Sequence, residues 1–132
     1  MTAAFIGVAV GLGAGLFGTV VGFDRERGFY PVVLIVIAAY YILFAAMGDP
    51  SALGVEAVLM ACFAALAVAG FRTTPWLVVV GLLAHAGLDA VHQPLIANAG
   101  APRWWPAFCG ACDVAMAGWL ALRLGAPGRP GS

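Results

Sequence analysis

Five uninterrupted apolar runs dominate this sequence, and no other feature constrains the fold as strongly. Each run approaches the length of about 20 residues that an α-helix needs to cross a hydrocarbon core of about 30 Å. A membrane-spanning β-strand would instead alternate between apolar and polar residues, which these runs do not do. We therefore expect an all-α, polytopic membrane protein in the form of a compact bundle of five transmembrane helices.

Prolines and glycines divide the apolar runs from one another. Pro31, Pro50, Pro75 and Pro106 each stand where a run begins. Proline is tolerated there because the first N–H groups of a helix have no partner within the helix. The predicted helices cover about 3–22, 31–47, 50–70, 75–93 and 106–124, within a single domain of residues 1–132.

The composition excludes a water-soluble domain. Only 9% of the residues are charged and 64% are hydrophobic, whereas soluble domains carry about 25% charged residues. The net charge of zero gives no electrostatic reason to expect a nucleic-acid partner. The first apolar run has no basic residue before it and no small-residue cleavage pattern after it, so we expect a retained helix rather than a signal peptide.

The arginines predict how the helices are oriented. With the N-terminus outside and the C-terminus inside, only Arg103 faces outward. That arrangement follows the positive-inside rule, and Trp104 and Trp105 would then lie in an outer aromatic belt. The arginines placed on the inner side are Arg25, Arg27, Arg72, Arg123 and Arg129.

A glycine stripe marks the first predicted helix. Gly7, Gly11 and Gly15 recur every four residues and therefore share one face. Small residues at this spacing let two helix backbones approach closely in lipid. The stripe predicts either packing against a helix of the same chain, which we favour, or a homodimer through this face.

Five ionisable residues fall inside the predicted helices. His85, Asp89 and His92 lie at positions i, i+4 and i+7, so they project from one face of the fourth helix. Each such residue costs about 2.5–3.5 kcal/mol at a helix centre, so it needs a partner or a purpose. At a rise of 1.5 Å per residue, Glu56 and Asp113 reach overlapping depths in the outer half of the membrane. Mutual pairing is the structural alternative, but we favour a functional site.

Imidazole and carboxylate groups at matching depth predict a divalent metal site. The candidate ligands are His85, Asp89, His92, Asp113 and Glu56, and the donor set suits Zn²⁺, Mn²⁺ or Fe²⁺. Zinc is the metal we name first. Glu56 and Asp113 are also the candidate catalytic residues, because a carboxylate left over from coordination can orient an imidazole or activate water.

Other polar residues are expected near this site. Cys109 and Cys112 stand one turn apart, and we interpret them as small apolar fillers, although thiolates would suit a softer metal. One of Tyr40 and Tyr41 is expected to reach the cluster while the other faces lipid or packing. Asn98 is expected to cap or line the outer mouth of the site.

Part of the sequence resembles a known family. The segments 23–31 and 40–48, His85 to His92, and Trp104 to Cys109 resemble a family of small bacterial membrane proteins of unknown function. The resemblance implies a compact helical fold in the bacterial inner (plasma) membrane and brings no activity. A fainter similarity is to ceramidase-like membrane hydrolases, which hold zinc with histidines and an aspartate. This chain has two histidines where those hydrolases use three, and fewer helices.

Three function classes follow from these observations. The first is a metal-dependent enzyme, a hydrolase acting on a membrane lipid or another amphiphile. The second is a transporter or channel subunit for a proton or metal ion, although the inner half of the helices offers little polarity beyond Thr19. The third is a haem-binding or structural membrane protein, and the carboxylates make haem less attractive. Whether the chain is an enzyme stays open at this point.

Overall fold

The computed structural model describes residues 1–126, and within them it contains five long α-helices. Each is long and apolar enough to cross a membrane, which confirms the predicted all-α, multi-pass fold. Short 3-10 turns, η1 (Phe23–Arg25) and η2 (Pro50–Ala52), lie in two of the connections. The helices are α1 (Thr2–Val21), α2 (Phe29–Gly48), α3 (Leu53–Arg72), α4 (Trp76–Leu95) and α5 (Trp105–Gly125).

The prolines lie where the sequence placed them, at or beside the start of an element. Pro31 is in the first turn of α2, and Pro106 is in the first turn of α5. Pro75 is the N-cap residue of α4, and Pro50 opens η2. All these positions lack an obligatory helical N–H bond. The predicted helix bounds therefore differ from the observed ones by three residues or fewer.

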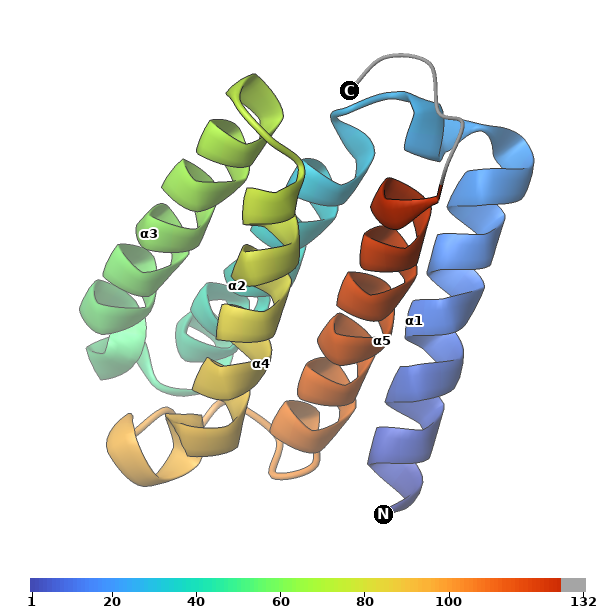
Figure 1. Ribbon diagram of the computed structural model, residues 1–132. Helices are drawn as coiled ribbons and strands as arrows, with labels where there is room; N and C mark the ends of the chain where they lie inside the picture. The colour runs from blue at the N-terminus through green and yellow to red at the C-terminus, as the bar shows by residue number, and fades with distance from the viewer. Residues whose placement is uncertain (127–132) are drawn as a thin grey trace.

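The helices form one bundle in which α5 packs between α1 and α4 (Figure 1). Helix α3 packs against α4, and α2 contacts both α3 and α4. The N-terminus, the connection that contains η2, and the loop over residues 96–104 lie at one end of the bundle (Figure 1). We call it the N-terminal end. The arginine distribution predicts that this end faces outward.

The glycine stripe of α1 packs against α5 of the same chain. A Cβ added at Gly7 would collide with the carbonyl oxygen of Phe108, and one at Gly11 would lie 2.5 Å from the carbonyl oxygen of Cys112. Only glycine permits backbones to approach this closely. The stripe thus serves intrachain packing. A homodimer through this face would have to displace α5, and it stays a prediction.

The two ends of the bundle interior differ in polarity. Toward the end opposite the N-terminus, buried Leu34, Leu82 and Met116 fill the space between α2, α4 and α5. Five buried carboxylates and imidazoles lie nearer the N-terminal end. They are Glu56, His85, Asp89, His92 and Asp113, each at most 2% exposed. The fold therefore holds these five groups away from lipid and concentrates them in one half, whereas the Asp24 carboxylate pairs with Arg123 at the other end.

Candidate metal centre

One face of α4 supplies the central residues of the site. His85, Asp89 and His92 are all buried, as their i, i+4, i+7 spacing predicts. Helix α4 is neighboured by α5, α3 and α2, so this face looks into the bundle rather than into lipid. Side chains from each of these three neighbours can therefore reach it.

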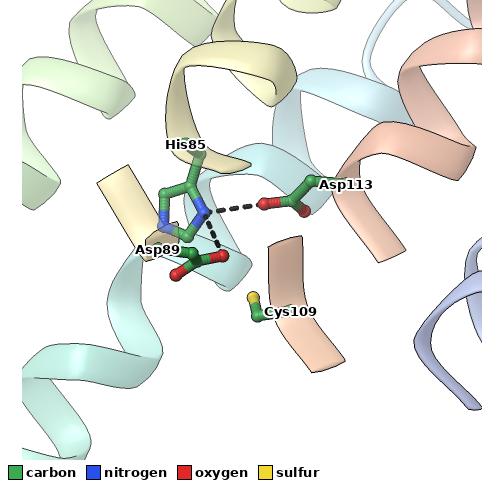
Figure 2. A group of neighbouring side chains, drawn as sticks. All are labelled: His85, Asp89, Cys109 and Asp113. Atoms are coloured by element: carbon green, nitrogen blue, oxygen red, sulfur yellow. Dashed lines mark hydrogen bonds and ion pairs between the residues drawn. The ribbon is translucent and has the colours of Figure 1, made fainter. Parts of the chain in front are cut away.

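His85 lies between two carboxylates (Figure 2). Its Nδ1 atom is 2.7 Å from Asp113 Oδ2 on α5, which is a hydrogen bond, and 3.6 Å from Asp89 Oδ2. Cys109, one helical turn before Asp113, adds its thiol to the same group. One ligand atom from each of the four residues lies within 4.8 Å of the others. We call these four residues the His85 cluster.

The carboxylates of the His85 cluster have more acceptor oxygens than the hydrogen bonds of the cluster satisfy. Asp89 Oδ2 and Asp113 Oδ1 are buried and accept no hydrogen bond within residues 1–126. Even with a protonated imidazole, two ionised carboxylates leave one uncompensated negative charge. A buried charge without compensation is costly, so this arrangement favours either an added proton or a bound cation.

The donor set fits a divalent metal. One imidazole nitrogen, two carboxylates and a thiol are groups that zinc binds, at about 2.0–2.3 Å from the ion. The short contact between His85 Nδ1 and Asp113 Oδ2 would open slightly as the metal took the place of the proton that these atoms share. The side chains already converge, so coordination needs only small movements of their ends.

Glu56 and His92 form a second group on the side of α4 that faces α3. His92 Nε2 is 2.9 Å from Glu56 Oε1. The amide of Asn98, from the 96–104 loop, donates to the same Glu56 oxygen at 2.8 Å and to the carbonyl oxygen of Tyr41 at 3.1 Å. We call Glu56, His92 and Asn98 the Glu56 cluster. It contains one carboxylate for one imidazole, so it has no excess of carboxylates.

Tyr41 of α2 joins the two clusters. Its hydroxyl donates to Asp89 Oδ1 at 2.6 Å, and its ring stacks on His92 with centroids 3.8 Å apart. Tyr40 instead is 37% exposed and packs against Phe44 and Trp105. The expectation that one tyrosine reaches the polar residues while the other faces outward is confirmed.

The 96–104 loop brings Asn98 over the Glu56 cluster. The loop lies so close to α2 that a Cβ at Gly100 would collide with the carbonyl oxygen of Phe44. At the end of α2, Asp49 Oδ2 accepts the backbone N–H of Ala99 at 3.2 Å. Two hydrogen bonds hold the pKa of the Asp49 carboxyl below its ordinary value. The larger effect comes from the Ser51 hydroxyl and the smaller from the N–H of Ala99. The contacts of Gly100 and Ala99 fix the loop beside the site.

The structure brings all the predicted site residues into the interior but divides them. His85, Asp89 and Asp113 meet in the His85 cluster, whereas Glu56 and His92 pair with each other. A ligand role for Glu56 and His92 therefore stays a prediction. Cys109 belongs to the His85 cluster although the sequence favoured a filler role for it. Its i, i+4 relation to Asp113, on one face of α5, was the signal that pointed to it.

The fold and this cluster together define a multi-pass membrane protein with a buried group that can bind a metal ion. Comparison with protein-family models, with curated proteins and with solved structures gave no match. The functional argument therefore rests on the residues themselves.

Proposed function

We propose that this chain is a metal-dependent hydrolase that acts on an amphiphile of the surrounding membrane. The observation that carries the proposal is the His85 cluster: four buried ligand groups converge, and two of their carboxylate oxygens accept no hydrogen bond from the described residues. In lipid such a concentration is expensive and points to function. A bound divalent cation would compensate the excess negative charge.

The roles within the cluster follow from the placement of each side chain. His85, Cys109 and Asp113 would hold the metal, which leaves Asp89 to accept a proton from the attacking water. Three protein ligands with one open position is the arrangement of catalytic zinc sites, and the metal supplies Lewis acidity there. The Tyr41 hydroxyl bond fixes one oxygen of Asp89 and leaves the other toward the cluster. Tyr41 is thus a positioning residue.

The thiol of Cys109 bears on which metal is bound. Sulfur ligands favour zinc over the harder ions manganese and magnesium. Imidazole and carboxylate alone would not make that distinction. We therefore retain zinc as the proposed metal, on the ground of the donor set.

Conduction of an ion is the less favoured function. A pathway would have to continue from the His85 cluster to the opposite end of the bundle. Buried Leu34, Leu82 and Met116 lie in that direction, and they offer no charge or hydrogen bond to an ion. A hydrolase needs access from one side only, which this distribution of polar groups allows.

The test is a hydrolysis assay on metal-loaded protein. Purified wild type, reconstituted with Zn²⁺ in vesicles of mixed lipids, should release a product that mass spectrometry detects. His85→Ala and Asp113→Asn should abolish the release, because each removes a proposed ligand. Cys112→Ser is the matched control for Cys109→Ser, since Cys112 is buried one turn away and lies outside the cluster.

Two results would count against the proposal. One is a zinc-loaded wild type that releases nothing from lipids with carboxylic ester, amide or phosphodiester bonds. The other is a product whose rate of release is the same in Asp113→Asn. Ion flux into protein-containing vesicles, with no product formed, would instead support the transport alternative.

A further inference from the structure

A lateral groove runs along the outer surface of α5 between α1 and α4. Its volume is about 890 Å³, within the range of about 300–1,000 Å³ that is usual for ligand pockets. Small side chains make the hollow, among them Ala86, Ala90, Ala107 and Ala115. Because these helices are long and apolar enough to span a membrane, the groove opens toward lipid chains rather than water.

The groove reaches the His85 cluster at Gly110. Asp89 and Gly110 both line the groove, and a Cβ at Gly110 would lie 3.6 Å from Asp89 Oδ2. That oxygen is the one that accepts no hydrogen bond from the described chain. A side chain at this position would cover it. Only this glycine, without a side chain, therefore separates the groove from a buried carboxylate oxygen that accepts no hydrogen bond from the described residues.

A single cation stands at the N-terminal end of the groove. Arg103 lines the groove, is exposed, and its side chain makes no hydrogen bond or ion pair with residues 1–126. Gly110 lies about 8 Å along α5 from its first residue, at a rise of 1.5 Å per residue. The interfacial layer of a bilayer is about 5–8 Å thick on each side. A phosphate at Arg103 would thus place the ester groups of the same lipid near Gly110.

From this geometry we infer that the groove binds an anionic glycerophospholipid of the bilayer, with one acyl chain along α5 and the phosphate against Arg103. Three features agree on this ligand: the groove is apolar along its length, it carries one free cation at the headgroup level, and it opens on the membrane. As an assignment of substrate, the inference rests on the proposed hydrolase.

The reaction at this position is hydrolysis of an acyl ester. The bond between the acyl carbon and the ester oxygen breaks, and the hydroxyl of water joins the acyl carbon to give a fatty acid. The proton of that water passes through Asp89 Oδ2 to the leaving alkoxide, which becomes an alcohol. Water is the only co-reactant, so the step balances without an oxidant or reductant.

Photocrosslinking in nanodiscs tests the binding site. The probes are phosphatidylglycerol and phosphatidylcholine, each with a diazirine in one acyl chain, at equal amounts in a phosphatidylcholine bilayer. We expect phosphatidylglycerol to label α4 and α5 peptides about fivefold more than phosphatidylcholine, the effect of one arginine at the interface. Arg103→Gln should remove the preference. Ala90→Phe should reduce labelling by filling the groove.

Ala84→Phe is the matched control, because Ala84 is an exposed alanine of α4 that does not line the groove. Its labelling should equal that of wild type. Equal labelling by the two lipids, labelling that survives Ala90→Phe, or a second copy of the chain covering these peptides would each overturn the inference. Zinc content measured on the same samples separates the two proposals. Specific labelling without bound zinc would support the lipid site and contradict the hydrolase. Bound zinc with equal labelling by the two lipids would support the metal site and contradict the lipid site.

Discussion

The His85 cluster and the Glu56 cluster use similar residues but balance their charge differently. The Glu56 cluster pairs one carboxylate with one imidazole and adds a neutral amide. The His85 cluster sets two carboxylates and a thiol around one imidazole. Both include buried residues of α4, and Tyr41 contacts both, so their environment is shared. The difference lies in composition, not in exposure.

That difference indicates that the Glu56 cluster is structural, whereas the His85 cluster is a site that needs a cation. His92 Nδ1 and Asn98 Oδ1 accept or donate no hydrogen bond in the Glu56 cluster, but the fully buried carboxylate oxygens of the two clusters that lack a hydrogen bond belong to Asp89 and Asp113. A buried carboxylate that is matched by an imidazole needs no added cation, and removal of either partner is strongly destabilising. A buried group with an excess of carboxylates needs a proton or a metal. The predictions below test this contrast.

The largest expected effect is on metal affinity. Asp113→Asn and His85→Ala should each lower zinc affinity by more than about 100-fold, because loss of a direct ligand should exceed the 10–100-fold effects of outer-shell partners. Glu56→Gln should leave the affinity unchanged. Competition with a chromogenic chelator in detergent measures all three. If Glu56→Gln lowered zinc affinity as much as Asp113→Asn, the two clusters would have to be regarded as one metal site.

The second effect is on stability. Glu56→Ala should lower the free energy of unfolding by about 3–5 kcal/mol, because it leaves His92 and Asn98 buried without their shared acceptor. Glu56→Gln keeps an acceptor oxygen and should lose less. Circular dichroism during denaturation in mixed micelles gives the free energies. A loss below about 1 kcal/mol in Glu56→Ala, the size of an average substitution, would contradict a structural role.

A smaller effect is expected where the clusters meet. Tyr41→Phe should cost about 1.5–3 kcal/mol, because it removes a hydrogen bond to a carboxylate while the ring still stacks on His92. Tyr40→Phe, beside it on the exposed side of α2, should stay within about 0.5 kcal/mol of wild type. The same unfolding measurement applies. Equal losses in both variants would remove Tyr41 from the site.

The smallest effect concerns the loop that carries Asn98. The pKa of Asp49 is lowered in the folded protein, so its contribution is present above the ordinary aspartate pKa and is lost as the pH falls through the lowered value. Hydrogen exchange over residues 96–104, compared with the intrinsic rate at each pH, should therefore speed up in acid. In Asp49→Asn it should be fast already at neutral pH, whereas Glu26→Gln, at the opposite end of the bundle, should match wild type.

The helices could be predicted because lipid imposes a simple requirement. Apolar runs of membrane length must be helical, and prolines can begin such helices but not continue them. Burial of Glu56, His85 and Asp113 followed from the same reasoning, since exposure of these side chains to lipid is costly. The one-face arrangement of His85, Asp89 and His92 followed from helical periodicity.

The division into two clusters could not be predicted. It depends on how α3 and α5 are rotated about their axes relative to α4, and periodicity within one helix does not fix that rotation. The position of Tyr41 between the clusters depends in the same way on α2. Cys109 was set aside because a cysteine is also a common small apolar residue, and only its contact with Asp89 and Asp113 distinguishes the two roles.

The central claim is that the His85 cluster holds a metal, with His85, Cys109 and Asp113 as its ligands, and cobalt substitution tests it most directly. Co²⁺ bound there should give visible d–d bands and a near-ultraviolet band from charge transfer between thiolate and cobalt. Cys109→Ser should lose the charge-transfer band and keep the d–d bands, and Cys112→Ser should keep both. Absence of any cobalt-dependent absorption in the wild type, or loss of the charge-transfer band in Cys112→Ser alone, would contradict the account.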